Sequence, residues 1–212
     1  MIQNYFSTPV LSLDKQEWLK DIDKFCKPHV KEAKAKLKKQ TNDKTFGLSY
    51  HSTTLLGDAN LKFFHDAVGQ MSYDFLETIG HDLTNYTVFF TESWVQEFNE
   101  KGGGHHSGHI HSNNHISGFY FLEVEEGSSQ PNFYDPRQAR VMMHLPEKDS
   151  KQLSYVNEKI HYKPTAGQLI IFPAYLTHEF AVQDKAKFRF IHFNAVAINN
   201  SYTGMKNELQ EK

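Results

Sequence analysis

The hydrophobic pattern of the first 84 residues is helical. Near the N-terminus, apolar residues recur at steps of three and four: Trp18, Ile22 and Phe25. Asp14 followed by Glu17 has the spacing of a capping box at the start of a helix. The residue before a proline disfavours helical conformation, so we expect this helix to end before Pro28. Five lysines follow between Lys31 and Lys39, and we interpret them as a solvated helix face that runs into a loop.

A longer apolar stripe predicts a second helix. Its members share the spacing of one helical face: Leu61, Phe64, Val68, Met71, Phe75 and Ile79. Asp58 precedes them as a candidate N-cap, and Gly80 follows as the C-terminal stop. We interpret this stripe as part of the hydrophobic core.

From Asn85 onward, short runs of β-branched and aromatic residues are separated by Gly, Pro, Asn or Asp. The runs are 86–99, 115–126, 131–135, 155–164, 167–173, 178–183 and 187–198. Such runs are typical of an antiparallel sandwich or barrel. We therefore predict one domain, mostly β with N-terminal α-helices. Residues 1–84 would form a helical segment packed on a β-core of residues 85–198, and residues 199–212 would form a polar tail.

The composition narrows the class of protein. The 212 residues include 17 Phe and 10 Tyr, which suits a β-rich core. The formal net charge of −2 indicates no nucleic-acid partner and no attraction to an anionic membrane. Cys26 is the single cysteine, so no intramolecular disulfide can form. Because we find neither a signal-peptide pattern nor an apolar run of the ~20 residues that cross a bilayer, we expect a soluble, cytoplasmic protein.

The strongest chemical signal is a histidine-rich stretch, GGGHHSGHIHSNNHISGFYFL at residues 102–122. Residues i and i+2 of a strand point to the same side, so His109 and His111 would present two imidazoles together if the segment is extended. Two imidazoles chelate Fe, Zn, Ni or Cu well, and Mg or Ca poorly. Taken alone, the motif is equally compatible with a solvated histidine-rich loop.

Two later residues extend this signal. His178 follows a Gly turn, an apolar strand and Phe172-Pro173. Arg189 lies in the sequence KFRFIHFNA, which is otherwise largely aromatic and aliphatic. An arginine inside a strand needs an anionic partner, because a desolvated charge without a partner is costly. A carboxylate from another strand would supply this partner as a structural ion pair, and an anionic ligand would also do so.

The order of these motifs resembles the 2-oxoglutarate- and Fe(II)-dependent oxygenases, and more narrowly an H-x-H branch often found in phages and marine bacteria. The resemblance covers roughly residues 85–198. It rests on the following segments, in order: Trp94, Gly102, His109-Ile110-His111, Ser117-Gly118-Phe119-Tyr120-Phe121-Leu122, Asp135-Pro136-Arg137, Phe172-Pro173, His178, Arg189 and Phe193-Asn194. It implies a double-stranded β-helix core, the jelly roll that is also found in cupins.

The resemblance also implies roles for the matching residues. His109, His111 and His178 would be the catalytic ligands of Fe(II). Arg189 would bind the C5 carboxylate of the cosubstrate 2-oxoglutarate, whose 2-oxo acid end chelates the iron. O₂ is the second cosubstrate, and hydroxylation is the default outcome; the motifs specify neither the primary substrate nor the oligomeric state. A phage-encoded protein would work in the host cytoplasm.

Two positions depart from the family pattern. The usual triad contains two histidines and one carboxylate, so the third ligand is either His111 or a carboxylate such as Asp135. Many relatives have a tyrosine that helps to bind the C5 carboxylate where this chain has Phe121. In a regular strand Tyr120 points to the opposite side, so another hydroxyl must substitute or Arg189 must hold the group alone.

Two other classes of protein fit part of this pattern. A cupin shares the barrel, and Gly103 with the H-x-H fits the first cupin motif. The second cupin motif places its histidine three residues after a glycine, whereas Gly167 and His178 are eleven residues apart. A cupin could be a dioxygenase, an isomerase or a sugar binder and would not require Arg189. A non-catalytic β-sandwich would close the coordination sphere of a structural metal and ignore 2-oxoglutarate.

Overall fold

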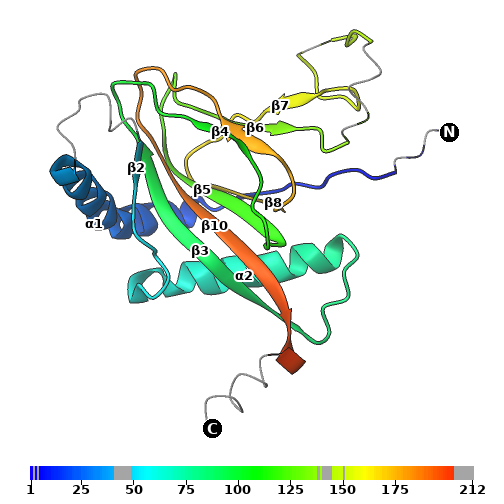
Figure 1. Ribbon diagram of the computed structural model, residues 1–212, viewed down its shortest axis with the longest axis horizontal. Helices are drawn as coiled ribbons and strands as arrows, with labels where there is room; N and C mark the ends of the chain where they lie inside the picture. The colour runs from blue at the N-terminus through cyan, green and yellow to red at the C-terminus, as the bar shows by residue number, and fades with distance from the viewer. Residues whose placement is uncertain are drawn as a thin grey trace.

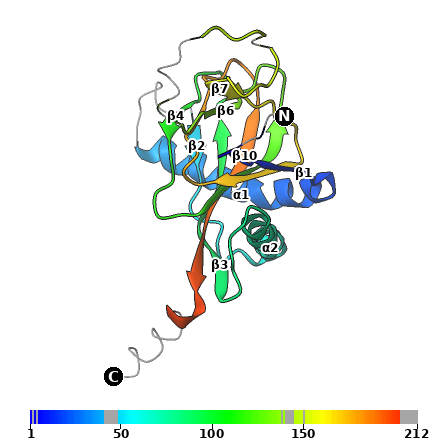
Figure 2. The same cartoon turned by 90° about the vertical axis from the view of Figure 1, so that its right-hand side faces the viewer.

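The computed structural model describes residues 1, 3, 5–40, 49–137, 139, 145–149 and 151–202. Two antiparallel β-sheets face each other, and two helices cover the outer face of the larger sheet (Figure 1, Figure 2). The elements are β1 (Leu11–Asp14), α1 (Gln16–Gln40), β2 (Ser49–His51), η1 (Ala59–Leu61), α2 (Lys62–Thr78), β3 (Tyr86–Phe98), β4 (His106–His109), β5 (Ile116–Val124), β6 (Pro131–Tyr134), β7 (Lys159–His161), β8 (Gln168–Pro173), β9 (His178–Phe180) and β10 (Phe188–Asn199). The prediction of a mostly β fold with N-terminal helices is confirmed.

The larger sheet has the strand order β1-β8-β5-β10-β3-β2, and the smaller sheet has the order β4-β9-β6-β7. Both edge strands of the larger sheet, β1 and β2, come from the first 84 residues. The hydrophobic pattern did not predict these strands, because four and three residues are too few to show a period. The N-terminal segment therefore extends the sheet as well as covering it.

Helix α1 differs from its prediction in length. It begins at Gln16, whose backbone N–H donates to Asp14 Oδ1 (3.2 Å), but it continues through Pro28 to Gln40. A proline inside a helix costs about 3 kcal/mol. Three apolar side chains on one face are buried on both sides of that proline: Ile22, Cys26 and Val30. Since burying one such side chain is worth about 1.5–3 kcal/mol, tertiary packing outweighs the local penalty.

Helix α2 agrees with its prediction. The Asp58 side chain accepts a hydrogen bond from the backbone N–H of Asn60 (2.9 Å) and caps the short η1 turn that leads into α2. Phe64, Val68 and Phe75 of the apolar stripe are buried, and Gly80 follows the helix with φ +107°. No helix in the described part of the chain is long and apolar enough to cross a membrane. Of the predicted tail, the structure describes residues 199–202, and the rest lies outside the described residues.

The larger sheet separates two cores. The helix-side core lies between this sheet and the helices, and the inter-sheet core lies between the two sheets. The inter-sheet core consists mainly of phenylalanine: Phe98, Phe119, Phe121, Phe133, Ile170, Phe172, Leu176, Phe180, Phe188 and Phe190. Side chains of β10 alternate between the cores, with Phe188 and Phe190 in the inter-sheet core and Ile191 and Phe193 in the helix-side core. This alternation decides which side chains of β10 can reach the histidines.

We expect Gly118→Ala to lower the free energy of unfolding by about 2–3 kcal/mol. A Cβ at this position of β5 would lie 2.5 Å from the Ile170 carbonyl oxygen and would overlap the Phe193 ring. Urea denaturation measures the change, and Gly69→Ala in α2 is the matched control. A Cβ at Gly69 meets Phe90 at an ordinary 3.5 Å, and alanine favours the helix. Equal stability of the two variants would contradict the close packing at Gly118.

Candidate metal centre

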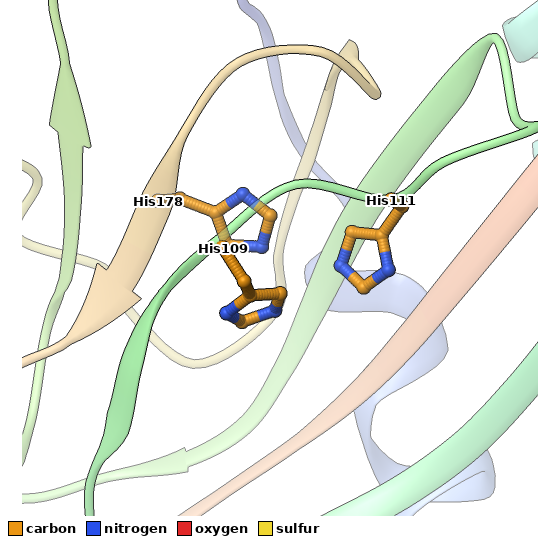
Figure 3. Close-up of side chains that lie close together, drawn as sticks. All are labelled: His109, His111 and His178. Carbon is orange, nitrogen blue, oxygen red and sulfur yellow. The ribbon is translucent and has the colours of Figure 1, made fainter.

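Strands β4 and β9 of the smaller sheet bring the predicted histidines together. His109 at the end of β4 is paired in register with His178 at the start of β9. His111 lies just beyond β4, where its backbone N–H donates to the Ala174 carbonyl oxygen (3.1 Å). One ring nitrogen of each histidine lies within 4.8 Å of those of the other two, and the three rings converge as Figure 3 shows. The predicted pair His109 and His111 and the distant residue His178 are therefore adjacent in space.

Backbone carbonyls fix the tautomers of two of these histidines. The Nδ1 atom of His109 lies 2.7 Å from the Ser107 oxygen, and Nδ1 of His178 lies 2.9 Å from the Leu176 oxygen. A carbonyl oxygen can only accept, so each neutral ring carries its hydrogen on Nδ1 and presents a lone pair at Nε2. The Nε2 atoms of His111 and His178 are buried without a hydrogen-bond partner among the described residues. Atoms of this kind are satisfied by a metal ion, so the donor set fits a transition metal such as Fe(II).

The environment keeps His111 and His178 neutral at physiological pH. Burial, with a smaller contribution from the neighbouring His109 and His111, lowers the pKa of His178 to about 3. Burial also lowers the pKa of His111 to about 4, with an added contribution from His109. Because a transition metal binds the neutral imidazole, protons do not compete for these ligands at pH 7.

We expect the metal-free protein to lose stability on acidification. His178 has a pKa of about 3 in the folded chain and about 6.5 in the unfolded chain. Between these values the unfolded chain binds the additional proton, so stability falls as the pH drops below about 6.5 and levels off near 3. Thermal unfolding of metal-free protein from pH 7.5 to pH 5 should show a falling midpoint. His178→Gln should reduce the slope, and an unchanged slope in this variant would contradict the assignment.

Aromatic side chains form one wall of the histidine cluster. The ring centroids of Phe172, Phe119 and Phe133 lie 5.0, 5.6 and 6.3 Å from that of His178. All three rings belong to the inter-sheet core and are buried. This wall excludes water from one side of the site and offers no charged group.

Polar residues from the larger sheet form the other wall. His192 lies between Trp94 and His111, with ring centroids 4.2 and 4.6 Å away. One ring nitrogen of His192, Nε2, is 3.1 Å from the Ser117 hydroxyl. Asn194, two residues further along β10, is fully buried and contacts Nδ1 of His111 through its amide nitrogen at 3.0 Å. Hydrogen-bonding groups of the site are therefore concentrated on this side.

The structure does not bring Arg189 to the histidines. Arg189 lies on the helix-side face of β10, the face that Ile191 and Phe193 share. Its guanidinium donates to Glu97 on β3 (2.8 and 2.5 Å) and to Asp23 on α1 (2.6 Å). A third carboxylate, Glu123 on β5, lies 3.0 Å away.

This position does not support the role expected for Arg189, and that role stays a prediction. The guanidinium is the centre of a largely buried ion-pair cluster, with 12% of the side chain exposed. The structural ion pair with carboxylates from other elements accounts for an arginine within an apolar strand. In this arrangement the larger sheet lies between Arg189 and the histidine cluster, so the guanidinium does not face that cluster.

The structure also describes the surroundings of the two positions that depart from the family pattern. Asp135 is not part of the converging donor group among the described residues; it accepts from Nε and Nη2 of Arg137 at 2.9 and 2.7 Å. The geometry therefore favours His111 as the third ligand. Phe121 is buried in the inter-sheet core, and the Tyr120 hydroxyl faces the other way and donates to the Lys15 carbonyl (2.9 Å).

Sequence reasoning assigned no role to three side chains at the site. His192 was interpreted as having no partner pattern, Glu92 was not singled out, and Asn194 was noted only as the end of the family pattern. His192 and Asn194 follow Phe190 at steps of two along β10, so all three lie on one side of the strand. The sequence offered no means of telling that this side faces the histidines.

A comparison with protein families matches the family that the sequence motifs resemble. Residues 92–194 match the model of the family described as "Putative 2OG-Fe(II) oxygenase". No curated protein sequence matches the chain.

Solved structures share the fold. A prolyl-4-hydroxylase from Pseudomonas putida is similar with a TM-score of 0.58 and 10% identity, over 90% of this chain and 94% of that one. The epimerase SnoN, in complex with Fe³⁺, alpha-ketoglutarate and nogalamycin RO, has a TM-score of 0.59 and 10% identity, over 91% and 81% of the two chains. EctD from S. alaskensis has a TM-score of 0.59 and 12% identity, over 89% and 73%. At these identities the likeness shows the double-stranded β-helix fold and no more.

Proposed function

We propose that this chain, whose residues 92–194 match the "Putative 2OG-Fe(II) oxygenase" family, is a hydroxylase of that family. Its Fe(II) would be held by His109, His111 and His178. Members of this family use Fe(II), 2-oxoglutarate and O₂. The observation that carries the proposal is the convergence of three ring nitrogens within 4.8 Å, two of them buried and without another partner in the described chain. Bound iron and cosubstrate supply the oxidising power that places an oxygen atom on the substrate.

The protein's own contribution is to hold the metal on one side and shield it. Three ligands leave coordination positions open for small molecules, as a catalytic centre requires and a structural site does not. Phe119 and Phe172 keep water from one side of His178. On the other side, Ser117 and His192 hydrogen-bond to each other, and Nδ1 of His192 is buried without a partner in the described chain.

An anaerobic optical titration tests this function. Fe(II) is added to the protein first and 2-oxoglutarate second, and the visible metal-to-ligand charge-transfer band of the iron–keto acid chelate is recorded. We expect a band that requires both additions and is absent in His109→Ala. Iron that binds without producing a band on addition of 2-oxoglutarate would refute the dependence on this cosubstrate.

A second candidate is a cupin-like metal protein that uses the three histidines without a 2-oxo acid. The position of Arg189 favours it, since the guanidinium is engaged by Asp23, Glu97 and Glu123 away from the metal. Phe121 also lacks the hydroxyl that relatives use for the C5 carboxylate. The same titration separates the two candidates, because the cupin-like protein would bind Fe(II) and give no charge-transfer band.

A further inference from the structure

His111 is held differently from the other two histidines. Fixed backbone carbonyls set the tautomers of His109 and His178, whereas the Nδ1 atom of His111 meets the side-chain amide of Asn194. An amide presents a donor at one end and an acceptor at the other, and the hydrogen-bond partners decide which end faces which neighbour. The tautomer of His111 therefore depends on the orientation of Asn194.

Glu92 sets that orientation. The Asn194 amide nitrogen donates to Glu92 Oε2 (2.8 Å) and lies 3.0 Å from His111 Nδ1. A carboxylate only accepts, so it holds the nitrogen end of the amide toward itself and toward His111. His111 then accepts at Nδ1 and carries its hydrogen on Nε2, which leaves no lone pair there for a metal. The Asn194 Oδ1 atom is buried with no partner in the described chain, as is His111 Nε2.

The ring of His111 has little freedom to adjust by turning. His192 packs on it with a centroid separation of 4.6 Å and is itself backed by Trp94 at 4.2 Å. His192 is 3% exposed, so this packing is closed to solvent. The move open to the site is a half-turn of the Asn194 amide, which would point Oδ1 at His111 and place the hydrogen on Nδ1.

We propose that Asn194 is a positioning residue that, together with Glu92, selects the tautomer of His111 and so decides whether His111 serves as the third metal ligand. This inference rests on the proposed metal site and not on 2-oxoglutarate. With the amide nitrogen toward His111, the centre has two competent ligands. With the amide oxygen toward it, the centre has three.

Matched substitutions separate the two orientations. Asn194→Asp alone would place two carboxylates in contact, so it is combined with Glu92→Gln, whose amide can donate to the new carboxylate. In the double variant Asn194→Asp/Glu92→Gln the carboxylate accepts from His111, which should hold the hydrogen on Nδ1 and keep His111 ready to bind. Leucine is similar in size and offers no hydrogen bond, so Asn194→Leu should lower the affinity for Co(II) by about 10- to 100-fold, the usual effect of losing a partner of a metal-ligating histidine. Glu92→Gln removes the fixed acceptor and should raise Co(II) affinity several-fold.

Two measurements, both made without 2-oxoglutarate, test this role. The Co(II) titration gives affinity and, from the d–d spectrum, the number of imidazole ligands. Long-range ¹⁵N–¹H NMR correlations of the imidazoles, recorded without metal and with Zn(II), give the tautomers directly. We expect His111 to carry its hydrogen on Nε2 in the metal-free wild type. We expect it on Nδ1 in the Zn(II) form and in the metal-free double variant Asn194→Asp/Glu92→Gln. His109 and His178 should keep the hydrogen on Nδ1 throughout.

The possible failures are distinguishable. A wild-type protein that binds neither Co(II) nor Zn(II) would refute the proposed metal site. A wild type that binds both metals, with equal affinity in Asn194→Leu or with His111 already protonated on Nδ1 in the metal-free form, would overturn the role of Asn194 and leave the metal site intact. Absence of a response to 2-oxoglutarate would bear on neither result.

Discussion

Replacing His178 or His109 by alanine is expected to weaken Fe(II) binding by roughly 100-fold or more. Loss of an outer partner of a ligand already costs about 10- to 100-fold, and loss of the ligand itself removes a metal bond. His178 is fully buried, and His109 is partly exposed. His109→Ala therefore removes a ligand without leaving a cavity in the core. His178→Ala removes the buried ligand. Isothermal titration calorimetry under anaerobic conditions measures the affinity.

The control for this experiment is His105→Ala. His105 is an exposed histidine of the same glycine-rich stretch and contacts the Gly103 carbonyl oxygen (3.1 Å). It lies outside the converging group, so its removal should leave the affinity unchanged. Similar losses in all three variants would indicate diffuse binding along a histidine-rich loop and would contradict a defined centre.

Arg189→Met is expected to lower the free energy of unfolding by about 3–5 kcal/mol, because it leaves buried carboxylates without their central cation. The side chains of Glu97, Asp23 and Glu123 are 11%, 20% and 31% exposed, and each contacts the guanidinium. Lys34 and Lys27 still pair with Glu97 and Asp23, which favours the lower end of this range. Urea denaturation at pH 7 measures the loss.

Two further variants separate the ion pair from ligand binding. Arg137→Met removes an exposed arginine that pairs with Asp135 and should cost less than about 1 kcal/mol. Arg189→Lys keeps a cation in the cluster and should fold, and we expect it to retain the charge-transfer band with Fe(II) and 2-oxoglutarate if the wild type shows one. A folded Arg189→Lys protein that binds Fe(II) but has lost the band would show that Arg189 reaches the cosubstrate after all.

The local sequence predicted helices that have one apolar face toward the core and one polar face toward solvent. The stripe of α2 has one apolar face, and the capping aspartate and the terminal glycine mark its ends. Helix α1 has the same kind of face, but Pro28 is a local signal to stop, and packing of Cys26 and Val30 in the helix-side core overrides it. A helix-breaking residue that costs a few kcal/mol predicts a helix end only where no tertiary contact offsets that cost.

The sequence by itself was enough to predict the fold class and the grouping of His109, His111 and His178. The H-x-H spacing brings His109 and His111 close, and the apolar strand before His178 places that residue at the start of the next strand. Tertiary structure alone decided the rest of the site. Strand β10 is buried on both faces, so its sequence is nearly continuously apolar and carries no alternation that reveals which face meets which core. Helices pack on one face of β10 and the smaller sheet packs on the other. Arg189 therefore lies among the carboxylates, and His192 and Asn194 lie at the candidate metal centre.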